Sequence, residues 1–147
     1  MYLSIFEMEK LRKAGFNFGE DEHLCYPGTI YFYKNKDYVI GGFGTPVYYF
    51  DKNAETDESL NKKWEYTELD KKIAAEGSRL ATVSDLLSYI EEKEYSFEIK
   101  RSTEDRYYYG EFRGENGHCF SASGPSFIDF LSKSVFKIAR YINSSSK

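Results

Sequence analysis

The chain is poor in the residues that cross-link a fold or bind metals. It has two cysteines, two histidines and three prolines among its 147 residues. Cys25 and Cys119 lie far apart in sequence, which excludes the dense disulfide framework of small secreted domains and favours a reducing compartment. No apolar run approaches the roughly 20 residues that cross a membrane, and the charges within residues 1–15 argue against a signal peptide. We therefore expect a cytoplasmic protein without a membrane-bound part.

The chain also lacks a strong excess of charge of one sign. Residues 1–80 carry 11 Lys and Arg against 14 Asp and Glu, residues 81–147 carry 9 against 10, and the net charge is −4. Affinity for a phosphate backbone depends on clustered basic side chains, so general binding to duplex nucleic acid is disfavoured. A local basic face remains compatible with this composition.

The two cysteines and two histidines have the composition of a zinc site but not its spacing. His118 and Cys119 are adjacent, and His23 and Cys25 are separated by one residue. Zinc ligands usually come in more widely spaced pairs, because neighbouring residues of a strand point to opposite faces. A Cys/His nucleophile pair would need a third, orienting group, and the carboxylates lie in charged runs rather than in apolar surroundings that tune an acid catalyst. We expect no metal, no cofactor and no catalytic centre.

A glycine cluster at residues 41–44 invites comparison with phosphate-binding loops. It fits neither G-x-G-x-x-G nor a P-loop, because no helix start with Lys and Ser or Thr follows it. Glycines of this kind are typical of a wide connection between strands. Phe43 lies within the cluster, and an aromatic residue at a loop tip is often a contact residue. Phe43 is therefore a candidate binding residue.

Aromatic residues are abundant, with 14 Tyr and 12 Phe. Large rings favour pleated sheet, and a tyrosine can keep its hydroxyl in water while its ring is buried. The length fits one domain that buries its own core. We expect an α+β fold of antiparallel sheets packed against helices, with one domain spanning residues 1–147.

Capping signals and periodicity predict the elements of the first 80 residues. Ser4 and Glu7 form a capping box, followed by an apolar helical period that ends at Gly15. Together with a β-meander, this helix fills residues 1–50. The expected elements are a helix at 4–14, strands at 29–33 and 38–40 around a turn at 34–37, a strand at 46–50, an acidic loop at 51–61, and a helix at 68–76 that a left-handed Gly77 terminates.

Residues 82–142 predict a second arrangement, with the order helix, three strands, helix. Thr82 and Asp85 cap the first helix, which ends near Lys93. Alternating aromatic and polar residues then indicate strands with one buried face. The expected elements are a strand from Tyr95, a turn at 103–106, a strand at 107–113, a turn at 114–117, a strand at 118–122, and a helix that begins at Gly124-Pro125 with an apolar seam of Ile128, Leu131, Val135, Ile138 and Ile142.

This order resembles the double-stranded-RNA-binding-domain-like topology, and the stretch 117–125 before an apolar helix resembles the end of small phage-encoded α-β-α sandwich proteins. RNA-binding members carry adjacent lysines at the start of the last helix, where this chain has the sequence Pro125-Ser-Phe-Ile-Asp-Phe130. The resemblance therefore implies a scaffold without the RNA-binding lysines. It also implies a small accessory protein of a phage or mobile element.

The middle strand of this unit interleaves aromatic rings with arginines, as single-strand nucleic-acid platforms do. Because side chains alternate along a strand, Tyr107, Tyr109 and Arg113 share one face, and Tyr108 and Phe112 share the other. One set must pack against helices. Structural packing of the rings is the simpler interpretation, and base stacking is the alternative.

The final helix carries a basic stripe on the side away from its apolar seam. The stripe consists of Lys133, Lys137 and Arg140. Such a stripe is usually a solvated helix face whose charges favour the C-terminal end of the helix. The sharper interpretation is a contact for phosphate or for an acidic partner.

With no complete catalytic or metal motif, binding ranks above catalysis. We expect a non-catalytic protein-interaction module, an inhibitor or regulator, in which exposed rings anchor a protein partner. A homo-oligomer accompanies this hypothesis, because so many rings are hard to bury in one chain. The alternative is nucleic-acid or nucleotide binding through the strand at 106–113 and the C-terminal helix. An enzyme would need a pocket that converges on His23, His118 or Cys119.

Overall fold

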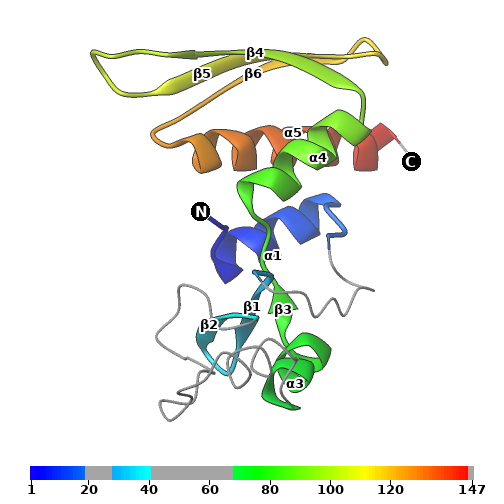
Figure 1. Cartoon of the computed structure of the whole chain (residues 1–147). Helices are drawn as coiled ribbons and strands as arrows, with labels where there is room; N and C mark the ends of the chain where they lie inside the picture. Colours follow the sequence, from blue (N-terminus) through cyan, green and yellow to red (C-terminus); the bar gives the residue numbers. More distant parts are fainter. Residues whose placement is uncertain (19–27, 41–67, 146–147) are drawn as a thin grey trace, which may run out of the picture. The chain divides into compact units, whose positions relative to one another are not determined.

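The computed structural model describes residues 1–18, 28–40 and 68–145. Within these residues, helices accompany two antiparallel three-stranded sheets (Figure 1). The predicted α+β class is confirmed. No helix of the described residues is long and apolar enough to cross a membrane.

Two compact units divide the chain. Unit 1 consists of Met1–Asn17 and Ala81–Lys147, and unit 2 consists of Phe18–Leu80. The two parts of unit 1 are joined through the backbone, where Leu3 N–H donates to the Ala81 carbonyl at 2.8 Å. The assignment of residues 1–147 to a single domain stays a prediction.

The first two helices of unit 1 begin at the expected capping boxes. In α1 (Ile5–Ala14), Ser4 Oγ accepts from Glu7 N–H at 3.3 Å. In α4 (Val83–Glu92), Thr82 and Asp85 exchange the equivalent pair of hydrogen bonds. Each hydroxyl satisfies a backbone donor that the first turn leaves without a partner.

The last helix, α5 (Phe127–Ser145), starts later than expected. Pro125 does not occupy its first position. Ser126 Oγ accepts from Asp129 N–H at 3.2 Å, so a hydroxyl cap, rather than the fixed φ of proline, defines the start. The centre of the apolar seam is confirmed, because Leu131, Val135 and Ile138 are fully buried, whereas Ile128 and Ile142 at its ends are half-buried.

The sheet of unit 1 has the order β4-β5-β6. Its strands are β4 (Tyr95–Arg101), β5 (Tyr108–Gly114) and β6 (Cys119–Gly124). All neighbours are antiparallel, and the register aligns three rings across the sheet, Phe97 with Phe112 and Phe112 with Phe120. The predicted helix, three-strand, helix order of residues 82–142 is confirmed.

One face of this sheet is covered by α4 and α5, and α1 packs on α5 from the side away from the sheet (Figure 1). The core under the sheet is aromatic. The Phe112 ring stacks on Phe97 and Phe120, with centroid distances of 4.9 Å and 4.7 Å, and contacts the fully buried Phe130 of α5. Burial of these rings fixes which face of the sheet meets the helices.

Unit 2 contains α3 (Glu68–Glu76) and the sheet β2-β1-β3. Its strands are β1 (Ile30–Tyr33), β2 (Lys36–Val39) and β3 (Ser78–Arg79), and β1 pairs with both of the others. The core consists of Tyr31, Tyr33, Ile40, Ile73 and Ala74.

Two details of unit 2 correct the sequence analysis. The turn between β1 and β2 is Lys34-Asn35 alone, with φ of 49° and 64°, because a two-residue turn with positive φ matches the twist of the paired strands. Gly77 follows α3 but is not left-handed. Glycine is needed at this position because the backbone of α3 passes close to it. An added Cβ would lie 2.6 Å from the Ile73 carbonyl oxygen. The predicted strand at 46–50 and the acidic loop at 51–61 lie outside the described residues.

Candidate binding groove

The two faces of the unit 1 sheet differ in polarity. Tyr108 and Phe112 face the helices, where Tyr108 stacks on Phe127. Tyr109 and Arg113 are exposed on the opposite, outer face. The alternation expected from the sequence therefore places the rings as predicted. The outer face carries Ser96, Glu98, Lys100, Tyr109, Glu111, Arg113, Cys119, Ser121 and Ser123.

Two exposed tyrosines lie at the start of β5. Tyr107 and Tyr109 are 40% and 41% exposed, with ring centroids 6.3 Å apart. The Tyr109 hydroxyl donates to the Asp105 carboxylate, which also accepts from Tyr107 N–H at 3.2 Å. The hydrogen bond from Tyr109 lowers the pKa of Asp105, and the same bond raises the pKa of Tyr109. The Tyr109 side chain is thus held in place while its ring stays accessible.

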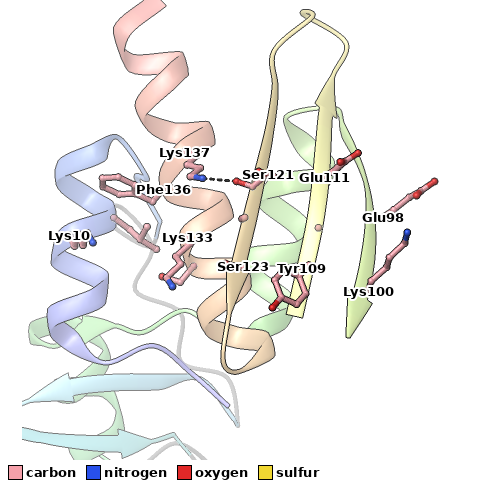
Figure 2. A pocket seen from close by; sticks show the side chains of 14 residues that line it. Lys10, Glu98, Lys100, Tyr109, Glu111, Ser121, Ser123, Lys133, Phe136 and Lys137 are labelled. Carbon is pink, nitrogen blue, oxygen red and sulfur yellow. Dashed lines mark hydrogen bonds between the residues drawn. The ribbon is translucent and has the colours of Figure 1, made fainter. Parts of the chain in front are cut away.

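A groove of about 650 Å³ runs along the flank of unit 1, past the edge of β6 (Figure 2). We call it the flank groove. One wall comes from α1 and α5, and the other from the sheet. Its lining residues are Lys10, Leu11, Glu98, Lys100, Tyr109, Gly110, Glu111, Ser121, Ala122, Ser123, Ser132, Lys133, Phe136 and Lys137.

Aromatic rings and a carbonyl position two of its lysines. Lys10 Nζ lies 5.0 Å from the centroid of the Phe136 ring, and Lys137 Nζ lies 5.8 Å from that of Phe120. The Lys137 ammonium also donates to the Ser121 carbonyl oxygen (Figure 2). Attraction between an ammonium and a ring face favours these placements.

The groove is basic on an acidic chain. Four lysines line it against two glutamates, whereas the whole chain has a net charge of −4. The two glutamates, Glu98 and Glu111, are direct cross-strand partners on the outer face. Like charges in that position repel each other. The groove therefore presents three lysines along the helices, and the sheet side carries the glutamate pair together with Lys100 of β4.

The structure brings together some of the predicted site residues and separates others. Lys133, Lys137 and Tyr109 line the groove. Tyr107 and Arg113 are exposed and close in sequence to Tyr109, but they do not line the groove. Arg140 is exposed on α5, also outside the groove. Phe43 lies outside the described residues.

Sequence reasoning missed Lys10 and Phe136. Lys10 reaches the groove only because α1 packs on α5, and no local pattern predicts which helices meet. Phe136 follows the apolar seam by one position, so its ring is half-buried rather than part of the core. The contact between the Lys10 ammonium and the Phe136 ring could not be predicted from the sequence, because the two residues lie 126 positions apart.

The residues around His118 and Cys119 form packing contacts. The His118 ring stacks on Tyr141 at a centroid distance of 3.8 Å, and its Nδ1 lies 2.8 Å from the Tyr95 hydroxyl. Burial raises the pKa of Tyr95. Cys119 is exposed on the outer face. His23 and Cys25 lie outside the described residues, and no cluster of three or more metal-ligating side chains occurs among those within them.

No protein-family model, curated protein or solved structure matches the chain.

Proposed function

We propose that the chain is a non-catalytic protein-interaction module, an inhibitor or regulator, whose contact surface is the flank groove. The observation that carries this proposal is the concentration of four lysines in one groove of a chain with net charge −4. Such local charge steers an acidic partner to one surface and disfavours self-association through it.

An exposed aromatic ring lies on the helix that supplies Lys10 to the groove. Phe6 is 80% exposed on α1, one helical turn before Lys10 and on the same face of the helix. A large ring exposed to this extent contributes little to the stability of the unit. At an interface, such a ring can supply much of the binding free energy when the partner buries it.

A charge-reversal experiment tests the proposal. Tagged wild-type protein, Lys133→Glu and Arg140→Glu are each used for pull-down from host lysate treated with nuclease, followed by mass spectrometry. Arg140 lies two turns further along the same helix and outside the groove, so it controls for the change in net charge. We expect a stoichiometric protein partner that Lys133→Glu loses and Arg140→Glu keeps. Equal retention by both variants would exclude the groove as the contact surface.

Binding of single-stranded nucleic acid is the second candidate. It is favoured by the exposure of Tyr107, Tyr109 and Arg113 near one face of β5, since bases stack on accessible rings. It is opposed by Glu98 and Glu111, which would repel phosphates on that face. Polarisation of a labelled oligonucleotide tests it, because phosphate contacts would make the affinity fall steeply with salt.

The remaining expectations belong to this proposal. We place the protein in a reducing cytoplasm, as an accessory protein of a phage or mobile element that acts as a homo-oligomer. The exposed Cys119 agrees with a reducing setting. Sedimentation equilibrium over a range of concentrations measures the oligomeric state, and a monomer throughout would contradict the homo-oligomer.

A further inference from the structure

The open edge of β6 presents an alternating row of backbone groups. β6 is the last strand of the order β4-β5-β6. Gly114 N–H donates to the His118 carbonyl at 2.8 Å, which identifies that pair as hydrogen-bonded. Hydrogen-bonded and non-hydrogen-bonded pairs alternate in an antiparallel ladder. It follows from the register that Cys119, Ser121 and Ser123 direct their backbone N–H and C=O groups away from β5.

The contact from α5 agrees with this register. Lys137 Nζ donates to the carbonyl of Ser121, one of the three residues that face outward. Lysine side chains commonly protect exposed strand edges against unwanted pairing. Here one exposed lysine occupies one acceptor, and a flexible side chain can leave it when a competing backbone donor and a carboxylate arrive together.

The flank groove lies against this edge. Ser121, Ala122 and Ser123 of β6 line it, and Lys133 and Phe136 of α5 stand across from them (Figure 2). The β6 side chains here are small. A chain approaching in extended conformation would therefore meet the backbone of β6 with the Lys137 side chain as the group to displace.

We propose that the flank groove binds an extended acidic peptide segment of the partner, which adds to the sheet as a fourth strand beside β6. Strand addition gives affinity through main-chain hydrogen bonds, and alternate side chains give specificity. The occupant is acidic because the groove carries four lysines against two glutamates. This inference rests on the proposed function and specifies how the groove holds its partner.

Synthetic peptides test the mode of binding with the full chain. The probe is a peptide of about seven residues that alternates Glu and Val, the length of an ordinary strand. Two isomers carry N-methyl groups, one on every Glu and the other on every Val, so each loses the donors of one edge only. A Lys/Val peptide controls for charge. Affinity is measured by fluorescence polarisation.

We expect the unmodified acidic peptide to bind and the Lys/Val peptide not to bind. One N-methylated isomer should bind at least about tenfold more weakly than the other, because only one edge faces β6. Equal affinity of the two isomers would overturn strand addition. Failure of the acidic peptide to bind would overturn it as well.

Amide hydrogen exchange by NMR locates the added strand. The N–H groups of Cys119, Ser121 and Ser123 should become protected when the peptide binds, while those of Phe120 and Ala122, which face β5, should change little. Protection without this alternation would overturn the proposal. Protection that rises with protein concentration in the absence of peptide would also overturn it, because the occupant would then be a second copy of the chain.

A proline variant gives an independent measurement. Ser121→Pro removes one outward backbone donor at a sheet edge, where proline is tolerated best. The variant should bind the acidic peptide more weakly, while its circular dichroism spectrum stays that of wild type. The N-methylated isomers decide the matter if this variant does not fold. If Lys133→Glu loses the protein partner while the two isomers bind equally, the proposed function stands and strand addition fails. If both variants of the pull-down keep the partner while one isomer binds more tightly than the other, the groove accepts an added strand but is not the contact surface for that partner.

Discussion

Replacing Phe112 with alanine should severely destabilise unit 1. The side chain is fully buried and packs between the rings of Phe97 and Phe120 and against Phe130. Phenylalanine to alanine changes in cores cost about 3–5 kcal/mol, because the transfer free energy of the ring is lost and a cavity remains. Three ring contacts meet at this site, so we expect a loss of about 4 kcal/mol.

Urea unfolding followed by circular dichroism measures this loss. With a slope of about 2 kcal/mol per molar, the midpoint should fall by about 2 M. The control is Glu111→Gln, at the preceding residue of β5, whose side chain is exposed on the outer face. Removal of its charge relieves repulsion with Glu98. The free energy of unfolding of the control should therefore be unchanged or higher by about 0.2–0.5 kcal/mol. A loss below about 1.5 kcal/mol for Phe112→Ala would refute the view that these rings hold the sheet to α5.

Three further predictions concern close packing, capping and pH. Gly110→Ala should cost about 1–3 kcal/mol in urea unfolding, because the new Cβ would lie 2.5 Å from Phe130 Cζ. Thr82→Ala should cost about 0.5–2 kcal/mol by the same assay, since it removes the acceptor of the Asp85 N–H bond; no loss would contradict the capping role. Burial raises the pKa of Tyr89 from 10.0 to about 12, so its contribution to stability is complete below pH 10 and is lost as the pH rises toward 12. Wild type should therefore lose more stability than Tyr89→Phe between these pH values, and parallel losses in unfolding experiments would contradict the shift.

Local signals predicted much of the fold. The pairs Ser4 with Glu7 and Thr82 with Asp85 each lie within one helical turn, so the capping chemistry is complete in a short stretch of sequence. The strands of unit 1 were found because one buried face imposes a period of two. β3, in contrast, is two residues long and gains its pairing only from β1. No periodicity can reveal such a strand, since it is defined by a neighbour more than 40 positions away.

The same division holds for the candidate site. Lys133 and Lys137 were found from their spacing along one helix. Whether these lysines face solvent or a groove depends on which strand forms the sheet edge beside α5. The order of the strands in the sheet decides this. The orientation of the Ser121 carbonyl likewise depends on the register between β5 and β6, which a single strand does not encode.

The charge pattern of unit 1 separates a protein ligand from a nucleic acid more sharply than the number of basic residues does. A strand added beside β6 would direct alternate side chains to its two faces. On one face they would meet Lys133, and on the other they would approach Glu111 on the outer face of the sheet. A peptide can satisfy both by alternating acidic residues with basic or hydroxyl residues. A nucleic acid carries the same negative charge at every phosphate, so it would gain from the lysines and lose against the Glu98–Glu111 pair. Neutralising that pair with Glu98→Gln and Glu111→Gln should therefore strengthen oligonucleotide binding, whereas binding of the Glu/Val peptide, whose glutamates face the lysines, should change little.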